Sequence, residues 1–322
     1  MFERLEMAPP DAILGLTEAF KKDPNPNKIN LGVGVYKDAE DKTPVLASVK
    51  EAEKRLLEAE KSKGYMPIPG DAKYGRLVQE LVFGKENALV KADRARTAHT
   101  PGGTGALRVA ADFLFRNYGP LTVWLSDPTW ANHPAIFEAA GHKVQYYPYY
   151  DAKNYSLNFD AMIDALAKIP AGDVVLLHGC CHNPSGIDPE PAQWRRIAET
   201  AAAAKWLALV DFAYQGFGDG LEEDAVGVRL IAEALPELLV CSSFSKNFGL
   251  YRERCGAFTL VAADAGASEK AFSQVEKAIR TNYSNPPAHG GMIITTILDD
   301  PALRHQGEKE VTEMRNRNNG MR

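Results

Sequence analysis

The chain has 322 residues, of which 45% are hydrophobic and 25% charged, a composition typical of soluble globular proteins. Its length suffices for one large α/β domain or two ordinary ones. Lys and Arg total 37 against 42 Asp and Glu, which gives a net charge of −5, and no basic stripe stands out. The sequence therefore predicts no nucleic-acid partner.

The predicted elements begin with an irregular segment and then alternate. Residues 1–32 end in DPNPNKINLG, and this content of Pro and Asn predicts an extended arm. A helix is predicted over residues 45–61, where apolar residues from Val49 to Leu57 recur at helical spacing. Short apolar segments then predict strands, and helical segments such as 191–205 separate several of them. The predicted strands are 121–127, 143–149, 173–179, 206–212, 238–244 and 255–262.

This alternation indicates the fold class. Short, nearly continuous apolar strands between helices are typical of a mostly parallel sheet that helices cover on both faces. We therefore predict an α/β fold. In such sheets ligands bind at the carboxyl ends of the strands, so polar residues that directly follow a strand are candidates for function.

A glycine-rich turn opens the segment TPGGTGALRVAADFLF, residues 100–115. The free N–H groups of Gly103 and its neighbours at the start of a helix, with the Thr104 hydroxyl, suit a phosphate group. Such turns also precede helices that bind nothing. The turn lacks the lysine of a nucleotide-binding P-loop, so ATP and GTP are not favoured.

Polar side chains also follow two apolar strands. Asp211 in WLALVDFAYQGF needs a partner for its charge, or it caps a following helix. Tyr214 lies three residues further on and could face the same cleft. Asn183 in HGCCHNPSGID precedes Pro184, which holds the backbone of Asn183 extended, although a plain turn explains this composition equally well.

Lys246 in SSFSKNFGLYRER, residues 242–254, follows the predicted strand 238–244. Most lysines are simply solvated. Ser243 and Lys246 have the S-x-x-K spacing of serine β-lactamases, but the S-D-N and K-T-G motifs of those enzymes are absent. An amine, an acid and an anion site on one sheet are the groups that pyridoxal phosphate requires.

Five motifs in order carry a resemblance to a known family. TPGGTGALRVAADF, CCHNPSG, DFAYQGF, SKNFGLYRER and NPPAHG resemble the aspartate and aromatic aminotransferases, pyridoxal-phosphate enzymes of fold type I, and HGCCHNPSGID and SKNFGLY favour the aspartate branch. The similarity covers essentially the whole chain. It implies a mostly parallel, mixed seven-stranded type of sheet and pyridoxal 5′-phosphate as the cofactor.

The resemblance also implies roles for individual residues. Lys246 would bond to the cofactor and carry the substrate Cα proton, and Asp211, supported by His133, would keep the pyridine nitrogen protonated. Tyr214 and Asn183 would hydrogen-bond the phenolic oxygen. Trp130 would stack on the ring. The phosphate would be held by Gly103, Thr104, Ser243 and Arg254, and by Tyr65 of a second subunit in a homodimer.

For the substrate, the resemblance implies contacts with Gly34, Trp130 and Asn183, and an ion pair between Arg280 and a side-chain carboxylate. We therefore expect transamination between L-aspartate, or an aromatic amino acid, and 2-oxoglutarate by a ping-pong mechanism. The alternatives are an impaired cofactor-binding or dimerisation fragment, and another fold type I reaction such as decarboxylation or elimination.

The resemblance further implies domain boundaries. Residues 1–42 would form an arm and the start of a small domain, 43–309 the large cofactor-binding domain, and 310–322 the beginning of the C-terminal part of the small domain. Family members continue beyond this point and supply a second arginine for the substrate α-carboxylate. Neither Arg315, Arg317 nor Arg322 matches its motif, so we expect a truncated chain.

The four cysteines lie at positions 180, 181, 241 and 255, without a C-x-x-C pair. This pattern predicts buried thiols in a reducing compartment and no metal site. The sequence has no apolar N-terminal leader and no run of 18 apolar residues, so a cytoplasmic protein without membrane contact is expected.

Overall fold

The computed structural model describes residues 1–8, 14–30, 32 and 34–321, and the chain divides into two compact units, Met1–Pro44 and Val45–Arg322. The first unit contains a short 3-10 helix, η1 (Phe2–Arg4), and a helix, α1 (Leu14–Lys22). The prediction of an extended arm is therefore wrong for α1. LGLTEAFKK contains no proline and ends in two lysines, which favour a helix C-terminus, and the Pro-rich stretch begins only after it.

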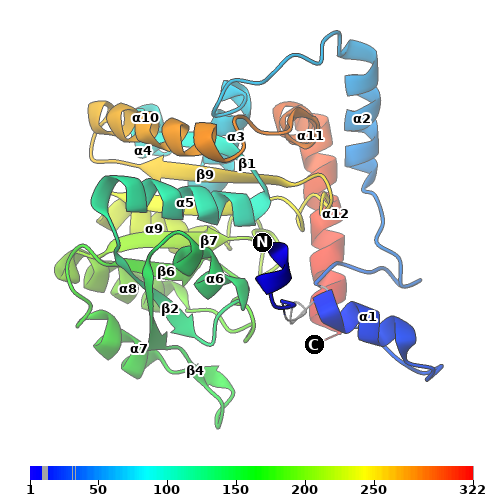
Figure 1. Cartoon of the computed structure of the whole chain (residues 1–322). Coiled ribbons are helices and arrows are strands. Elements are labelled where there is room, and N and C mark those ends of the chain that lie inside the picture. The colour runs from blue at the N-terminus through cyan, green and yellow to red at the C-terminus, as the bar shows by residue number, and fades with distance from the viewer. Residues whose placement is uncertain (9–13, 31, 33, 322) are drawn as a thin grey trace. The chain divides into compact units, whose positions relative to one another are not determined.

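The second unit is built on a seven-stranded sheet with the strand order β1-β9-β8-β7-β6-β2-β3 (Figure 1). All six predicted strands are confirmed, and β1 was missed. A separate short hairpin pairs β4 (Tyr150–Asp151) with β5 (Ser156–Leu157). The strands of the large sheet are β1 (Ala95–Pro101), β2 (Thr122–Asp127), β3 (Lys143–Pro148), β6 (Val174–His178), β7 (Leu207–Phe212), β8 (Leu238–Ser243) and β9 (Cys255–Val261).

The strand directions bring the ends of several strands to one edge of this sheet. Strand β9 is antiparallel to both of its neighbours, β1 and β8, whereas the other neighbouring strands are parallel. Six strands therefore share one direction and end at the same edge, and β9 begins there. Residues that follow those strands and residues that precede β9 are brought to one place.

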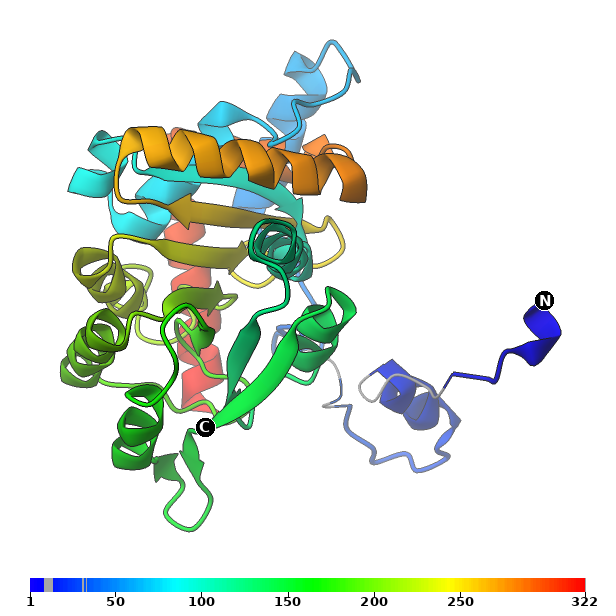
Figure 2. The same cartoon turned by 60° about the vertical axis from the view of Figure 1, so that its left-hand side comes forward.

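Helices cover both faces of the sheet. On one side lie α5 (Gly102–Tyr118) and α6 (Asn132–Ala139), and on the other α8 (Pro191–Ala204) and α9 (Val226–Ala234) (Figures 1 and 2). The other helices of this unit are α2 (Ala47–Ala59), α3 (Ala72–Phe83), α4 (Ala88–Lys91), α7 (Phe159–Leu166), α10 (Ala265–Asn282), α11 (Ala288–Asp299) and α12 (Pro301–Gly320). None of the helices in the described ranges has the length and apolar content that crossing a bilayer would require.

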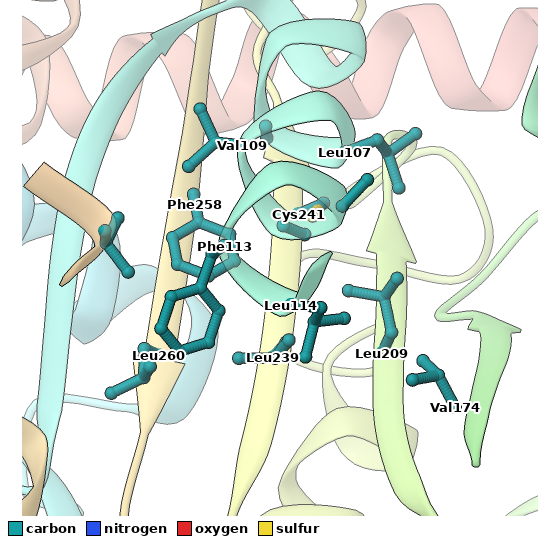
Figure 3. Packing of buried hydrophobic residues seen from close by; sticks show 14 of the residues in the cluster. Leu107, Val109, Phe113, Leu114, Val174, Leu209, Leu239, Cys241, Phe258 and Leu260 are labelled. Carbon is teal, nitrogen blue, oxygen red and sulfur yellow. The ribbon is translucent and has the colours of Figure 1, made fainter. Parts of the chain in front are cut away.

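The core between α5 and the sheet is built from buried hydrophobic residues (Figure 3). Leu107 and Leu114 of α5 are at most 1% exposed, and Phe113 packs on Phe258 of β9 with the ring centroids 6.4 Å apart. Every residue of β8 and β9 is buried. Strands buried on both faces read as continuous apolar runs, which explains why the sequence revealed them.

Helix α12 is attached to α2 by a side chain that caps the start of α2. A carboxylate oxygen of Glu310 accepts a hydrogen bond from the backbone N–H of Ala47 at 2.8 Å, and the Ser48 N–H also points to this carboxylate. The first N–H groups of a helix lack intrahelical partners, so an acceptor from another element stabilises the helix start. The polar segment at the C-terminal end is thus an ordered helix.

Gly307, inside α12, gives the first testable prediction. A Cβ atom there would meet Ile297 Cγ2 at 3.5 Å and Ser48 Oγ at 3.6 Å, which are ordinary contacts. Because alanine favours a helix interior over glycine by about 1 kcal/mol, Gly307→Ala should raise the midpoint of thermal unfolding. Gly216→Ala is the control: its φ of 98° and contacts of 2.9 Å to Leu221 and Val311 predict destabilisation. A lower midpoint for Gly307→Ala would contradict this packing.

Candidate active site

The carboxyl edge of the sheet brings together the segments that follow β6, β7 and β8. In the ladder, His178 of β6 is paired with Asp211 of β7, and Asp211 is paired with Cys241 of β8. Lys246 follows the end of β8 and Tyr214 follows the end of β7. The Lys246 Nζ atom lies 4.5 Å from the centroid of the Tyr214 ring.

Lys246 is half-buried, and this lowers the pKa of its amine below the ordinary value of a lysine. Desolvation is the main cause, because burial disfavours the charged ammonium. The negative charge of Asp211 acts in the opposite direction, and the positive charge of Arg254 lowers the pKa further. A neutral amine is therefore available here at a lower pH than on an exposed lysine.

These opposing charges predict pKa shifts of opposite sign. Asp211→Asn removes a group that raises the Lys246 pKa, so the pKa should fall further. Arg254→Gln removes a group that lowers it, so the pKa should rise. The measurement is the pH dependence of acetylation of Lys246 in the cofactor-free protein, followed by mass spectrometry, with the exposed Lys309 as internal reference. Shifts in the same direction would contradict the assigned electrostatics.

Asp211 is held by a chain of hydrogen bonds that runs through two histidines. Its Oδ2 atom lies 2.8 Å from His133 Nε2, and the Nδ1 atom of that ring lies 2.8 Å from Thr129 Oγ1. Thr129 Oγ1 is also 3.1 Å from His178 Nε2. No helix begins directly after Asp211, because α9 starts only at Val226. The alternative of a helix cap for Asp211 is therefore wrong, and the carboxylate is oriented by a buried ring.

Tyr214, Asn183 and Trp130 line the same site. The Asn183 side chain hydrogen-bonds the Tyr214 hydroxyl, while burial, followed by the charge of Asp211, raises the pKa of Tyr214 to about 12. The phenol therefore stays protonated at neutral pH and can donate a hydrogen bond. The Trp130 ring packs edge-on against His133, with the centroids 5.2 Å apart.

Groups that suit an anion lie at the start of α5, where β1 ends and β9 begins. Pro101 pairs with Cys255, and Ser243 pairs with Gly256, so the Gly102–Gly103 turn, Ser243 and Arg254 are neighbours. A side chain at Gly102 would collide with the Arg254 guanidinium, and one at Gly256 would collide with the Gly102 backbone. The glycines thus allow a close approach of a guanidinium, a serine hydroxyl and a helix N-terminus, all of which favour a phosphate. Thr104 is exposed in this first turn.

Two predicted residues of the unit Val45–Arg322 do not join this cluster. Tyr65 is 96% exposed, and Arg280 is exposed in the last turn of α10, where it hydrogen-bonds Ser284. Within residues 45–321 we find no hydrogen bond or ion pair from either side chain to the Lys246 cluster. Gly34 belongs to the other compact unit, Met1–Pro44, and is exposed there.

Thr129 and His178 were missed by the sequence reasoning. His178 is the last residue of β6, so the rule that selected Asp211 would have selected it as well. Thr129 and His133 are four residues apart in DPTWANH, and the contact joins them across the start of α6. Thr129 follows no motif and ends no strand, so only the folded structure reveals its contact.

Pyridoxal phosphate fits the chemistry of this edge. The amine of Lys246 has a lowered pKa, the carboxylate of Asp211 faces the same site, and the glycine cradle beside Arg254 accepts an anion. These are the three functions that a protein supplies to this cofactor. The fold and the site therefore define a pyridoxal-phosphate-dependent enzyme.

Comparison with known proteins identifies the family. The sequence matches aminotransferase class I and II over residues 26–322. It is 58% identical to the aspartate aminotransferase of Escherichia coli, over 100% of this chain and 81% of that protein. It is 49% identical to the aromatic-amino-acid aminotransferase of Pseudomonas aeruginosa, over 98% of this chain and 79% of that protein. The chain belongs to the class I and II aminotransferase family.

A solved structure supports this assignment. The aromatic-amino-acid aminotransferase of Burkholderia pseudomallei, covalently bound to pyridoxal phosphate, superposes with a TM-score of 0.96 at 47% identity, over 98% of this chain and 79% of that chain. The cytoplasmic aspartate aminotransferase of Saccharomyces cerevisiae gives a TM-score of 0.95 at 38% identity, over 98% and 79%. The protein is an aminotransferase with a mixed seven-stranded α/β fold, and its cofactor is pyridoxal phosphate.

Proposed function

We propose that this enzyme transfers the amino group of L-aspartate to 2-oxoglutarate, with aromatic amino acids as further donors, in a ping-pong reaction. The amino group stays on the cofactor between the two half-reactions. The observation that carries the proposal is the Lys246–Tyr214–Asp211 cluster in a chain that is 58% identical to an aspartate aminotransferase.

Each residue of the cluster has a role in this proposal. When bound, the cofactor supplies an electron sink for the substrate Cα. Lys246 takes the Cα proton and returns it, which requires the neutral amine that burial favours. Asp211, oriented by His133 and Thr129, would hold a proton on the pyridine nitrogen of the cofactor. Tyr214 and Asn183 hydrogen-bond the phenolic oxygen.

The remaining cofactor contacts follow from the anion site. Arg254 and Ser243 would bind the phosphate together with the backbone N–H groups of Gly103 and Thr104 and the Thr104 hydroxyl. These contacts would fix the position of the ring. Trp130, whose ring lies against His133, stacks on the cofactor and contacts the substrate, as does Asn183.

We further propose a cytoplasmic homodimer with shared active sites. The exposure of Tyr65 and of Arg280 supports it, since both side chains are available to a partner subunit. Tyr65 would reach the partner's phosphate, and Arg280 the distal carboxylate of the substrate there. Gly34 would line the substrate pocket. The four free cysteines fit a reducing compartment.

We also propose the domain division 1–42, 43–309 and 310–322. The boundary between compact units after Pro44 lies close to the first division and supports it. The second division, after residue 309, falls inside α12.

The proposed reaction is tested by its products. Protein loaded with pyridoxal phosphate and supplied with L-aspartate and 2-oxoglutarate should form oxaloacetate and L-glutamate in equal amounts. L-Aspartate alone should yield one oxaloacetate per active site and then stop, because a ping-pong enzyme needs the second substrate to regenerate. Release of ammonia or carbon dioxide in place of L-glutamate would favour elimination or decarboxylation.

Arg280→Leu tests the choice of substrate. The guanidinium can pair with a side-chain carboxylate through two parallel hydrogen bonds, which leucine cannot replace. Losing a charge-assisted pair commonly costs about 2–5 kcal/mol. We therefore expect kcat/KM for L-aspartate to fall roughly tenfold to a thousandfold, and that for L-phenylalanine to fall much less. An equal loss for both substrates would show that Arg280 serves the fold or the cofactor.

A further inference from the structure

The two segments that carry Lys246 and Tyr214 leave the sheet side by side, and the backbone pairing between them then ends. Pairing between β7 and β8 ends at Phe212 and Ser242. Beyond that point, the side-chain amide of Asn247 donates a hydrogen bond from Nδ2 to the backbone oxygen of Gln215 at 3.2 Å. This bond joins the residue after the lysine to the residue after the tyrosine.

The acceptor of this bond is itself fixed. Gln215 is 2% exposed, and its side-chain amide donates to the backbone oxygens of Leu81 at 3.0 Å and Leu221 at 2.9 Å. On the other side, the turn that begins at Lys246 is closed by a hydrogen bond from the Gly249 N–H to the Lys246 oxygen at 3.0 Å. Asn247 therefore links two ordered turns.

Asn247 is a polar residue at a buried position, where an apolar residue would be expected. It is 4% exposed, and its Oδ1 atom has no hydrogen-bond partner among residues 1–8, 14–30, 32 and 34–321. Burying a polar amide costs free energy unless its hydrogen bonds are made, whereas an apolar residue carries no such cost. Asn247 also lines a cavity of about 20 Å³ beside Leu46 and Ile297, which has room for one water molecule.

We propose that Asn247 is a positioning residue, which holds the Lys246 amine in register with the Tyr214 hydroxyl. The inference rests on the proposed function. The amine must reach the substrate Cα while the phenol stays on the cofactor, and a small displacement between the two groups would slow proton transfer. The hydrogen bond from Asn247 to the Gln215 backbone fixes one turn directly to the other.

The test uses Asn247→Leu, which keeps the branched shape and the number of side-chain heavy atoms and removes both the donor and the amide oxygen. Its thermal midpoint should stay within about 3 °C of wild type, while kcat falls about tenfold or more at little change in KM. The pH midpoint of the visible band of the cofactor-loaded protein should move upward, because the Lys246 nitrogen bonded to the cofactor would be less confined and better hydrated, which favours its protonated form. Asn319→Ala is the matched control. It removes a hydrogen bond of 3.1 Å from the Asn319 side-chain amide to the backbone oxygen of Gly218 in the same loop, and it should change neither kcat nor the pH midpoint.

The outcomes separate this inference from the proposed function. If wild-type protein loaded with pyridoxal phosphate shows no visible band, the proposed function fails. If wild type shows the band and Asn247→Leu keeps the wild-type kcat and pH midpoint, only the role of Asn247 is overturned. Should Asn247→Leu fail to fold, Asn247→Ala removes the donor without adding volume or charge. A loss of stability with an unmoved pH midpoint in that variant would also overturn the proposal.

Discussion

Lys246→Ala should almost abolish transamination, because it removes the group that moves the substrate proton. General acid–base groups contribute roughly 10²–10⁴-fold to rate, so kcat should fall by at least this factor. The anion site at α5 is untouched, and pyridoxal phosphate should still bind. The measurements are steady-state turnover and equilibrium dialysis with the cofactor.

The control for this variant is Lys309→Ala, which removes an exposed lysine of α12 and should leave turnover unchanged. The alanine variant should also lose the visible band that depends on a bond between the cofactor and the amine. Near-normal turnover in Lys246→Ala would place the proton transfer on another residue.

Asp211→Asn should lower kcat roughly 10²–10³-fold, the range observed when one preorganised electrostatic contact is removed. Asparagine has the same size and can keep the 2.8 Å contact to His133, so the fold should persist. What is lost is the negative charge that holds a proton on the pyridine nitrogen. Turnover and thermal unfolding measured on the same preparation separate the two effects.

Asp173→Asn provides a matched control. Asp173 accepts a hydrogen bond from the Trp124 ring at 2.9 Å and precedes β6, so it lies at the opposite edge of the sheet from Asp211. Its substitution changes the charge by the same amount and should leave turnover intact. If both asparagine variants were equally active, Asp211 would have only a structural role.

The sheet was largely predictable because its central strands β6, β8 and β9 are buried throughout and read as apolar runs. Strand β1 was missed because its sequence ARTAHTP is half polar, and its pairing with β9 and packing against α3 form only in the tertiary structure. Helix α1 was missed because the prolines that follow it dominated the interpretation of the whole segment. Local sequence therefore predicts buried apolar strands well, but it predicts poorly those strands that depend on contacts with distant segments.

For the site, too, individual residues could be predicted from the sequence, but their mutual arrangement could not. The rule that ligands collect at strand ends selected Asp211, Asn183 and Lys246 individually. Their mutual geometry depends on the strand order, which places β6, β7 and β8 next to one another, and on contacts such as that between Thr129 and His178. Residues that a partner subunit would use have no signal in one chain.

The most direct test of the central claim is a covalent map of the cofactor. Protein loaded with pyridoxal phosphate is reduced with borohydride, digested, and analysed by mass spectrometry. We predict one modified peptide, with the cofactor on Lys246, and loss of the visible band when L-aspartate is added before reduction. A label on a different lysine, or a protein that binds pyridoxal phosphate without any reducible bond, would contradict it.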